Sequence, residues 1–381
     1  MRRHLLVTND FPPKIGGIQS YLWELWRRLP PDATTVLTTP HRGAAAFDAA
    51  QPMRIVRTRD RVLLPHPGLA RRIRGLANEV GAEIVLLDPA LPLGAVGPRL
   101  GVPYGVVLHG AEVTVPARLP GLSALLSRVL RDASIVISAG GYAAGEAERC
   151  ASRELPVIEV PPGVDTDRFV PLGAEARLRA RHRFGLDGGP LVVCLSRLVP
   201  RKGFDAVIDA ISRLRSAHPG LQLAMAGAGR DRRRLERLAQ RLGVPVVFLG
   251  RISGDDVPLF IAMGDVFAAP CRSRWAGLEQ EGFGIVFVEA AACGVPAVAG
   301  RSGGSHEAVV HGRTGLVVER PADAGEVAAA IDDLLSSERG RAAMGAAARR
   351  ESELRFSYDG LAARLEAALS EMSGPGISNR G

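Results

Sequence analysis

Residues 274–289 read Arg-Trp-Ala-Gly-Leu-Glu-Gln-Glu-Gly-Phe-Gly-Ile-Val-Phe-Val-Glu. Gly282 and Gly284 permit the backbone to approach a ligand closely, and the apolar run behind them predicts a helix that starts near Phe283. The free amide groups of a first helical turn, with the positive end of the helix dipole, form an anion site. The stretch therefore predicts a glycine-rich loop that leads into a helix whose start fits a diphosphate.

Two glutamates flank this predicted anion site. Glu289 lies about 9 Å along the helix axis, at about 1.5 Å per residue, whereas Glu281 stays on the preceding loop. A nucleotide-sugar carries a ribose and a hexose, both rich in hydroxyl groups, on either side of its diphosphate, so one carboxylate on each side suits it. The alternative is two solvated surface glutamates, and the rest of the chain favours the ligand site.

The sequence has two lysines, Lys14 and Lys202, among 48 basic residues. Because nearly all basic positions are arginine, a retained lysine indicates a need for a compact point charge. Lys202 lies beside Arg197 and Arg201 in a segment that directly follows a predicted strand, which favours an anion ligand there. Lys14 precedes Gly16 and Gly17 after the first strand, and for it an anion ligand and an ordinary exposed lysine both stay open.

Length and composition bound the class of protein. A chain of 381 residues, 46% hydrophobic and 23% charged, predicts two folded domains. The net charge of +8 indicates anionic partners, but 5% aromatic residues and the lack of any RNA- or DNA-reading motif argue against nucleic acid. We also find no signal peptide and no uncharged apolar stretch of about 18 residues, so we expect any membrane contact to be peripheral.

Four scattered cysteines bear on metal binding and compartment. No two of them are spaced as a Cys-x-x-Cys pair. We therefore expect buried, reduced thiols in a cytosolic protein rather than a metal site or a disulfide framework. They are Cys150, Cys194, Cys271 and Cys293.

Short β-branched runs alternate with helical patterns along the chain, which is typical of an α/β fold with parallel sheets. In the first half the expected strands are Leu5–Val7, Thr35–Leu37, Arg54–Arg57, Ile84–Leu87, Tyr104–Leu108, Ile135–Ser138 and Val157–Val160, with helices near 17–29, 69–80, 91–100, 121–131 and 141–150. In the second half they are Leu191–Leu195, Gln222–Ala226, Val246–Leu249, Val266–Ala269, Pro296–Ala299 and Gly315–Val318, with helices near 204–217, 230–242, 255–263, 284–293, 304–310 and 323–336.

This rhythm predicts two doubly wound, Rossmann-like domains joined in a segment dense in turn residues, 161–169. We assign 1–165 to an amino-terminal domain and 166–355 to a second domain. The family resemblance set out below implies that the first domain faces acceptor and membrane and that the second binds the donor. A helix pair near 339–371 follows, and we expect its last part, 356–372, to pack back on the first domain. The tail, 373–381, is predicted to be disordered.

In open α/β sheets, ligands bind beyond the carboxyl ends of the strands. His109 and Gly110 follow one strand of the first half, and the segments of Arg197 and of the two glutamates follow strands of the second half. Gly227-Ala-Gly229 superficially matches a dinucleotide fingerprint, but Arg232 stands at the third glycine position, so a redox protein is the weaker interpretation.

Several motifs together resemble a known family. They are Val-Thr-Asn-Asp-Phe-Pro-Pro13 with Gly16-Gly-Ile-Gln-Ser-Tyr21, Pro161-Pro-Gly-Val-Asp-Thr-Asp-Arg-Phe169, Leu195-Ser-Arg-Leu-Val-Pro-Arg-Lys-Gly203, Cys271-Arg-Ser-Arg274 with Glu281 to Glu289, Ser302-Gly-Gly with Glu307, and Thr314-Gly-Leu-Val-Val318. From about Leu5 to the final helix the chain resembles the retaining family-four glycosyltransferases of GT-B architecture, in which two Rossmann-like domains face each other across a cleft. The opening segment and Cys271-Arg-Ser-Arg274 resemble, more narrowly, the PimB-type mannosyltransferases of actinobacteria.

The resemblance implies an activity: transfer of mannose from GDP-mannose to phosphatidylinositol monomannoside through an α-1,6 linkage. It implies same-face attack with retention, the leaving phosphate taking the acceptor proton, and neither a metal nor another cofactor. The implied partners are the nucleotide-sugar, a phosphoinositide glycolipid and an anionic membrane surface. We expect a monomer or weak homo-oligomer in the cytoplasm, peripherally bound to the inner face of the cell membrane.

The resemblance also assigns roles to residues. For the donor, Arg197, Arg201 and Lys202 would neutralise the diphosphate, the amides of Phe283, Gly284 and Ile285 would complete its cradle, Gly16 and Gly17 would let a loop close on it, Ile252 would adjoin the base and Glu289 would hold the ribose. At the hexose, Glu281 would bind hydroxyl groups and His109 would lie near the reacting carbon. The acceptor would meet Asp10 and Gln19.

Two alternatives to this activity stay open from the sequence. One is a transferase that uses a UDP- or ADP-sugar or another acceptor, and the other is a non-catalytic or redox nucleotide-binding protein.

A basic, amphipathic helix is predicted within residues 65–76. It combines Arg71, Arg72 and Arg74 with Leu69, Ile73 and Leu76. Such a helix can lie on an anionic bilayer, and it is equally the pattern of a helix that packs on its own sheet. The sequence leaves both interpretations open.

Overall fold

The computed structural model describes residues 1–372 and divides the chain into two compact units. Unit 1 comprises Met1–Pro162 and the segment from Tyr358 onward, and unit 2 comprises Gly163–Ser357. The sequence-based division at 165/166 and at 355/356 lies within three residues of these boundaries. The tail at 373–381, predicted to be disordered, lies outside the described residues.

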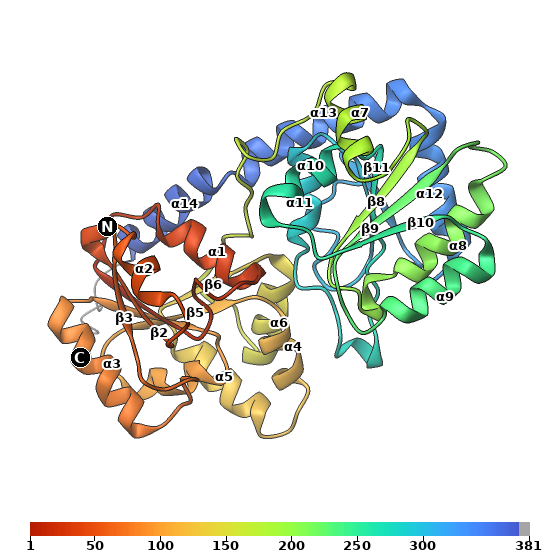
Figure 1. The fold of residues 1–381 in the computed structure, drawn as a ribbon. Helices are drawn as coiled ribbons and strands as arrows, with labels where there is room; N and C mark the ends of the chain where they lie inside the picture. Colours follow the sequence, from red (N-terminus) through yellow and green to blue (C-terminus); the bar gives the residue numbers. More distant parts are fainter. Residues whose placement is uncertain (373–381) are drawn as a thin grey trace. The chain divides into compact units, whose positions relative to one another are not determined.

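Unit 1 is built on a seven-stranded parallel sheet in the order β3-β2-β1-β4-β5-β6-β7 (Figure 1). Its strands are β1 (His4–Thr8), β2 (Thr34–Thr38), β3 (Arg54–Arg57), β4 (Ile84–Asp88), β5 (Tyr104–Leu108), β6 (Ile135–Ser138) and β7 (Val157–Glu159). Its helices are α1 (Gly17–Trp26), α2 (Ala44–Ala49), α3 (Pro67–Val80), α4 (Ala111–Ala117), α5 (Leu122–Asp132), α6 (Gly141–Ala151) and α14 (Tyr358–Glu371), with short 3-10 helices at Pro31–Ala33 and Leu93–Arg99.

The central strands of unit 1 are buried on both faces, which is why their sequences read as nearly continuous apolar runs. On one face α3, α5 and α6 cover a core that includes Ile73 and Val129. On the other face α1 packs beside α14, so that Leu361 and Leu365 of the carboxyl-terminal helix complete the core of the amino-terminal sheet (Figure 1).

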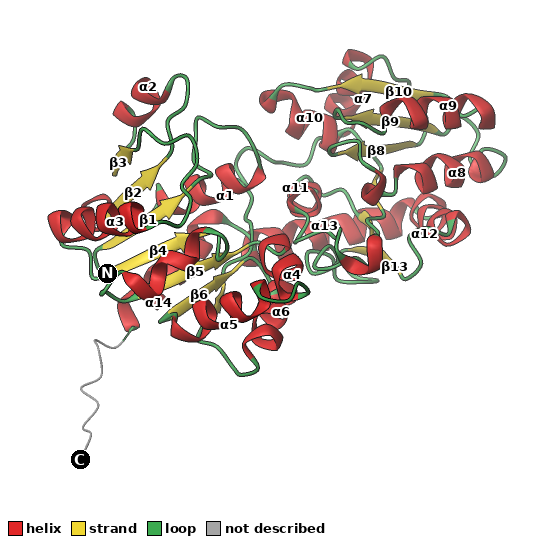
Figure 2. Cartoon of the chain, turned by 90° about the horizontal axis from the view of Figure 1, so that it is seen from below, coloured by secondary structure: helices red, strands yellow, loops and turns green. Residues whose placement is uncertain are grey.

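Unit 2 repeats the architecture with a six-stranded parallel sheet in the order β10-β9-β8-β11-β12-β13. Its strands are β8 (Leu191–Leu195), β9 (Gln222–Ala226), β10 (Val246–Gly250), β11 (Val266–Ala269), β12 (Ala297–Gly300) and β13 (Gly315–Val318). Its helices are α7 (Ala174–Arg183), α8 (Phe204–Leu214), α9 (Arg232–Leu242), α10 (Val257–Ala262), α11 (Ile285–Ala292), α12 (Ala324–Ser336) and α13 (Glu338–Arg355), with 3-10 helices at Pro200–Lys202, Gly254–Asp256 and Trp275–Gly277. Helices cover both faces of this sheet (Figure 2).

Two helix predictions need correction. The segment 304–310 is a series of turns rather than a helix, because Gly303 has a φ of 55° and the Gly304 amide donates to the carbonyl oxygen of Glu281. The segment 91–100 is a 3-10 helix at Leu93–Arg99 with Pro98 inside it, and proline cannot supply an α-helical amide donor.

The strand orders place a topological switch point in each sheet. Chain connections reverse direction between β1 and β4 in unit 1 and between β8 and β11 in unit 2. Loops that leave two such neighbouring strands diverge to opposite faces, which opens a crevice at the carboxyl edge. The predicted site residues of each unit should therefore gather at these two points.

Candidate functional site

The switch point of unit 2 brings together the loops that follow β8 and β11. The β8 loop carries Arg197, Arg201 and Lys202, and the β11 loop leads to Glu281. The Arg272 amide donates a 2.8 Å hydrogen bond to the carbonyl oxygen of Arg201, which joins the two loops. Segments about 80 residues apart in sequence thus form one cluster of charged side chains.

At the centre of this cluster is a buried carboxylate. One oxygen of Glu281 lies 2.7 Å from the Lys202 ammonium and also pairs with the Arg201 guanidinium. Burial opposes ionisation, but the two cations outweigh it and lower the pKa of Glu281 to about 2. Lys202 is 4% exposed. The sequence interpretation assigned these cations to a diphosphate and Glu281 to a hexose, and the structure shows that all three side chains share one location.

Arg197 supplies a charge that is still available to a ligand. Its side chain is exposed, and within residues 1–372 it has no hydrogen bond or ion pair. With Arg201 and Lys202 against Glu281, the cluster carries a net charge of +2, which suits a diphosphate.

The start of α11 faces the same loop. Gly284 precedes the helix with a φ of 90°, and a Cβ at that position would lie 2.7 Å from the Phe287 ring, so glycine is required. Phe283 is buried and packs against Phe356, with ring centroids 5.9 Å apart. The Phe283 side chain is therefore used in packing, and the predicted ligand contact through the backbone amides of Phe283, Gly284 and Ile285 stays a prediction.

Glu289 has an environment opposite to that of Glu281. It lies in the second turn of α11, and across the described chain no side chain pairs with its carboxylate. Burial raises the pKa of Glu289 to about 7, and the charge of Arg168 only partly offsets this. A partly buried carboxylate without a protein partner can accept hydrogen bonds from hydroxyl groups of a ligand. Ile252 follows β10 and is half-buried against the core.

The Gly227-Ala-Gly229 segment has a packing role. A Cβ at Gly227 would lie 1.9 Å from the Ser196 carbonyl oxygen, and one at Gly229 would lie 2.1 Å from that of Leu198. These glycines let the β9 loop contact the β8 loop, which accounts for them without a dinucleotide.

In unit 1 the switch point is organised by Asp88 at the end of β4. Thr8 at the end of β1 donates a 2.5 Å hydrogen bond to one carboxylate oxygen, and His109 Nε2 lies 2.6 Å from the other. Burial lowers the pKa of His109, but the Asp88 carboxylate outweighs this effect and raises it above its ordinary value. The Tyr21 ring packs edge-on against the imidazole at 5.6 Å. His109 is thus held in one orientation.

The β1 loop continues this network. The amide of Asp10 donates to the Thr8 hydroxyl at 2.8 Å, and the Asp10 carboxylate pairs with Lys14 at 2.6 Å and accepts from Gln19 at 2.5 Å. Gly16 precedes α1, and a Cβ there would lie 2.1 Å from the Gln19 amide oxygen, while Gly17 is the exposed first residue of the helix. The structure thus places Gly16 and Gly17, predicted for the donor, in the same loop and helix start as Asp10 and Gln19, predicted for the acceptor.

The arginine-rich helix α3 packs on its own sheet. Leu69, Ile73 and Leu76 are buried in the unit 1 core, whereas Arg71, Arg72 and Arg74 are exposed. The packing interpretation is confirmed for the apolar residues, and any contact of this helix with a membrane would be made by charge alone.

The sequence interpretation missed two groups of residues at these edges. Asp88 was left outside the predicted strand, although a carboxylate at a strand's carboxyl end was a visible signal. Asp205 in the first turn of α8 pairs with Arg272 at 2.8 Å and with Arg234 at 3.1 Å. That network fixes the β11 loop and could not be found from sequence, because its members lie 67 and 29 residues apart.

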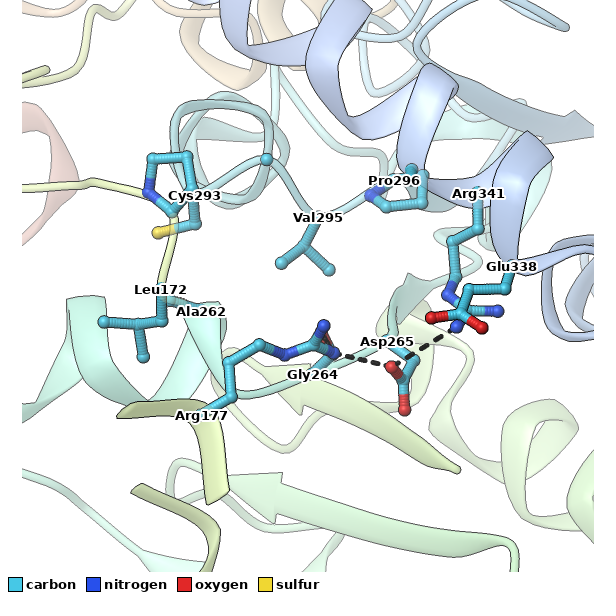
Figure 3. Close-up of a pocket in the computed structure, with 13 residues that line it drawn as sticks. Leu172, Arg177, Ala262, Gly264, Asp265, Cys293, Val295, Pro296, Glu338 and Arg341 are labelled. Atoms are coloured by element: carbon cyan, nitrogen blue, oxygen red, sulfur yellow. Dashed lines mark hydrogen bonds and ion pairs between the residues drawn. The ribbon is translucent and has the colours of Figure 1, made fainter. Parts of the chain in front are cut away.

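A cavity of about 140 Å³ lies at the opposite, amino-terminal edge of the unit 2 sheet (Figure 3). Arg177 and Arg341 both point toward Asp265 there, at 2.6 Å and 3.7 Å, and the Asp265 carboxylate accepts from the first amide of β8 at 2.8 Å. These contacts tie α7 and α13 to the sheet, so we interpret the cavity as structural. Within residues 1–372 no three His, Cys, Asp or Glu side chains are grouped as metal ligands, and no helix is both long and apolar enough to cross a bilayer.

Comparisons with known proteins agree with this geometry. The family model described as Glycosyltransferase Family 4 matches residues 15–168, and the one described as Glycosyl transferases group 1 matches residues 177–351. A Mycolicibacterium smegmatis protein named GDP-mannose-dependent alpha-(1-6)-phosphatidylinositol monomannoside mannosyltransferase is 43% identical over 379 residues, which cover 96% of this chain and 98% of that protein. The chain belongs to the family 4 glycosyltransferases.

Further relatives of this glycosyltransferase support the assignment and the fold. A Corynebacterium glutamicum protein named GDP-mannose-dependent monoacylated alpha-(1-6)-phosphatidylinositol monomannoside mannosyltransferase is 36% identical over 96% of this chain and 97% of its own length. The crystal structure of Anabaena HepE in complex with UDP has a TM-score of 0.82 at 21% identity, covering 97% of this chain and 99% of that one. The GT-B fold class is confirmed by this likeness.

The contrasting environments of the two glutamates predict opposite effects on stability. Ionised Glu281 stabilises the fold above its ordinary pKa of 4.5, and this contribution is lost as pH falls from there through about 2. Glu281→Gln should therefore lower the free energy of unfolding at pH 7, and the free energies of the variant and of wild type should converge in strong acid.

Glu289 should have the opposite effect. Its pKa is raised to about 7, so the folded protein keeps a proton that the unfolded chain releases above 4.5, and the free energy of unfolding falls as pH rises through 7. Glu289→Gln should be at least as stable as wild type at pH 8.

Urea unfolding at several pH values between about 2 and 8 measures both effects. The control is Glu175→Gln, since Glu175 is 86% exposed and its pair with Arg179 should contribute little at any pH. Equal destabilisation by Glu281→Gln and Glu289→Gln at pH 8 would contradict the assignment of opposite environments.

Proposed function

We propose that this glycosyltransferase moves mannose from GDP-mannose to phosphatidylinositol monomannoside and forms an α-1,6 linkage. The observation that carries the proposal is the Arg197–Arg201–Lys202–Glu281 cluster beside the start of α11, with Glu289 unpartnered in the same helix. Relatives of 43% and 36% identity, which align over almost the whole chain and carry names for this activity, support the choice of substrates.

The donor roles follow from charge. Arg197, Arg201 and Lys202, with the amides at residues 283–285, bind the diphosphate and stabilise the negative charge that builds up as the nucleoside diphosphate leaves. Glu289 accepts from the ribose hydroxyls, and Ile252 adjoins the base. Glu281 turns from its cations to the hydroxyl groups of the hexose when the diphosphate takes over those cations. This charge stabilisation requires no metal or other cofactor.

Unit 1 supplies residues for both the donor and the acceptor. His109, oriented by Asp88, contacts the hexose near the reacting carbon, and Gly16 and Gly17 allow the β1 loop to approach the phosphates. Asp10 and Gln19, which already hydrogen-bond to each other, present oxygen and nitrogen atoms to the acceptor. The leaving phosphate takes the acceptor proton on the face that it vacates, and the configuration at the sugar is retained.

Product analysis tests the proposal directly. The purified protein should transfer mannose to phosphatidylinositol monomannoside from GDP-mannose and not from UDP- or ADP-sugars, with an α-1,6 linkage in the mass and linkage analysis.

Lys202→Ala should lower turnover at saturating donor by about 10²–10³-fold, because it removes preorganised charge at the leaving group. Arg213→Ala, which removes an exposed cation paired with Asp209 on α8, is the control for loss of one positive charge. Near-normal turnover in Lys202→Ala would disprove the diphosphate role.

Substitutions of the two glutamates should separate the binding of GDP from the transfer of mannose. Glu289→Gln should weaken GDP binding, since its carboxylate is expected to hold the ribose. Glu281→Gln should lower kcat more than GDP affinity, since it is expected to act on the hexose. Isothermal titration calorimetry with GDP, together with kinetics, measures both. An equal loss of GDP affinity in the two variants would mean that the roles are wrongly divided.

We also propose a peripheral location at the inner face of the cell membrane, with docking by the exposed arginines of α3. Each basic side chain near an anionic leaflet contributes about 1 kcal/mol. Changing Arg71, Arg72 and Arg74 together to glutamate should therefore remove most binding to phosphatidylinositol-containing vesicles in sedimentation assays, and high salt should have the same effect on wild type.

A matched triple variant controls for net charge. Helix α9 of unit 2 also presents three exposed arginines, Arg233, Arg237 and Arg241, and their change to glutamate alters the total charge by the same amount. This second variant should keep vesicle binding. If both triple variants bind as wild type does, the docking surface lies elsewhere.

A further inference from the structure

The β11 loop contains a small hairpin directly before the charged cluster. Arg274 and Glu279 form an antiparallel bridge, with the Arg274 amide donating to Glu279 at 2.9 Å and the Glu279 amide donating back at 3.2 Å. Their side chains pair at 2.8 Å, and Arg230 lies 3.7 Å from the Glu279 carboxylate. The side-chain amide of Gln280 caps the tip by donating from Nε2 to the Gly277 carbonyl oxygen at 2.6 Å. The hairpin is therefore held by several hydrogen bonds and ion pairs.

Both ends of this hairpin are attached to the diphosphate loop of unit 2. Before it, the Arg272 amide bonds to the carbonyl oxygen of Arg201 at 2.8 Å. After it, Glu281 pairs with Arg201 and Lys202. The tip is thus a fixed extension of the site at which the donor hexose is proposed to lie.

The tip presents an aromatic side chain at a cost in backbone strain. Trp275 and Ala276 have φ values of 50° and 51°, in the left-handed region that non-glycine residues rarely adopt, and Gly277 follows at 83°. The Trp275 side chain is nonetheless 62% exposed, although an indole gains most free energy when it is buried. Strained residues of this kind gather at ligand-contact sites, where surrounding contacts hold them in place.

The surroundings of the indole select the chemistry of its ligand. The Arg274 guanidinium stacks over one face at 4.8 Å, so the other face is the one open to a ligand. Charged groups that donate and accept hydrogen bonds belong to the same hairpin: Arg274, which covers the first face, pairs with Glu279, and Arg230 lies 3.7 Å from the Glu279 carboxylate. A flat apolar face with a polar rim fits a saturated polyol ring, whose C–H groups contact the negative face of an indole while its hydroxyl groups bond at the rim.

We propose that Trp275 is a stacking platform for the sugar or inositol ring of the acceptor. The inference rests on the proposed function, because the acceptor's ring must lie beside the donor hexose when the new glycosidic bond forms, and Glu281 lies six residues after Trp275. The ring that stacks on Trp275 is brought toward the anomeric carbon by a hairpin that is itself fixed to the diphosphate loop. Trp275 therefore contributes to acceptor affinity and not to donor binding.

Kinetics with a soluble acceptor test this platform. The probe is deacylated phosphatidylinositol monomannoside, which has both rings and no acyl chains. Trp275→Ala should raise the acceptor KM about tenfold, with kcat and the KM for GDP-mannose within about twofold of wild type. Trp275→Phe should recover part of the loss. Ala276→Gly is the matched control, because it relieves strain at the neighbouring position and keeps the indole, and it should leave the acceptor KM unchanged.

A binding readout that needs no turnover accompanies the kinetics. Trp26 is buried and Trp23 is partly buried, so Trp275 dominates the acrylamide-sensitive tryptophan fluorescence. The deacylated acceptor, added with GDP, should reduce acrylamide quenching in wild type and not in Trp275→Phe.

The outcomes separate this inference from the proposed function. If wild type transfers mannose but Trp275→Ala keeps its acceptor KM, only the platform is wrong. A rise in the GDP-mannose KM alone would show that the indole stacks on the base, and a loss seen only with vesicle-bound lipid acceptor would show a membrane anchor; each overturns the proposal. If wild type transfers no mannose, the proposed function fails, and the quenching experiment still tests the platform.

Discussion

The buried contact of Glu281 with Lys202 and Arg201 holds the functional end of unit 2 together. A carboxylate that is 13% exposed would be costly alone, and two cations at hydrogen-bond distance make it tolerable. Because Lys202 and Arg201 belong to the β8 loop and Glu281 to the β11 loop, the ion cluster also fixes the crevice at the switch point. The same contact sets the position of the α11 start, which follows Glu281 by four residues.

Unit 1 uses a similar device with different chemistry. Asp88 is buried at its own switch point, and its two oxygens bind one group from β1 and one from the end of β5. In each unit, then, a buried carboxylate joins the loops that leave neighbouring strands. The difference is in the partners: two cations leave a positive site in unit 2, whereas a hydroxyl and an imidazole make an orienting site in unit 1.

The strands could be predicted well because their signal is local. β3, β5, β6, β8, β9, β11 and β13 have the predicted bounds, since a parallel strand covered on both faces reads as an apolar run closed by turn residues. Helical segments without a periodic apolar stripe were harder to predict from the sequence. The segment 304–310 looked helical, but its amide at Gly304 bonds to the loop of Glu281, a partner that local sequence does not reveal.

The sequence by itself determined the fold class, the two-domain organisation and the residue types of the site, because glycine-flanked helix starts, strand ends and a retained Lys202 each have a local signature. Tertiary structure alone decided the electrostatics. Glu281 and Glu289 look alike in the sequence, yet one is held ionised by two cations and the other is raised toward neutral pH by burial. The tertiary structure also decided that the apolar stripe of α3 packs in the core of unit 1 and that Trp275 is exposed to solvent. Charge pairing and burial depend on groups brought together from distant segments, and only the folded chain defines them.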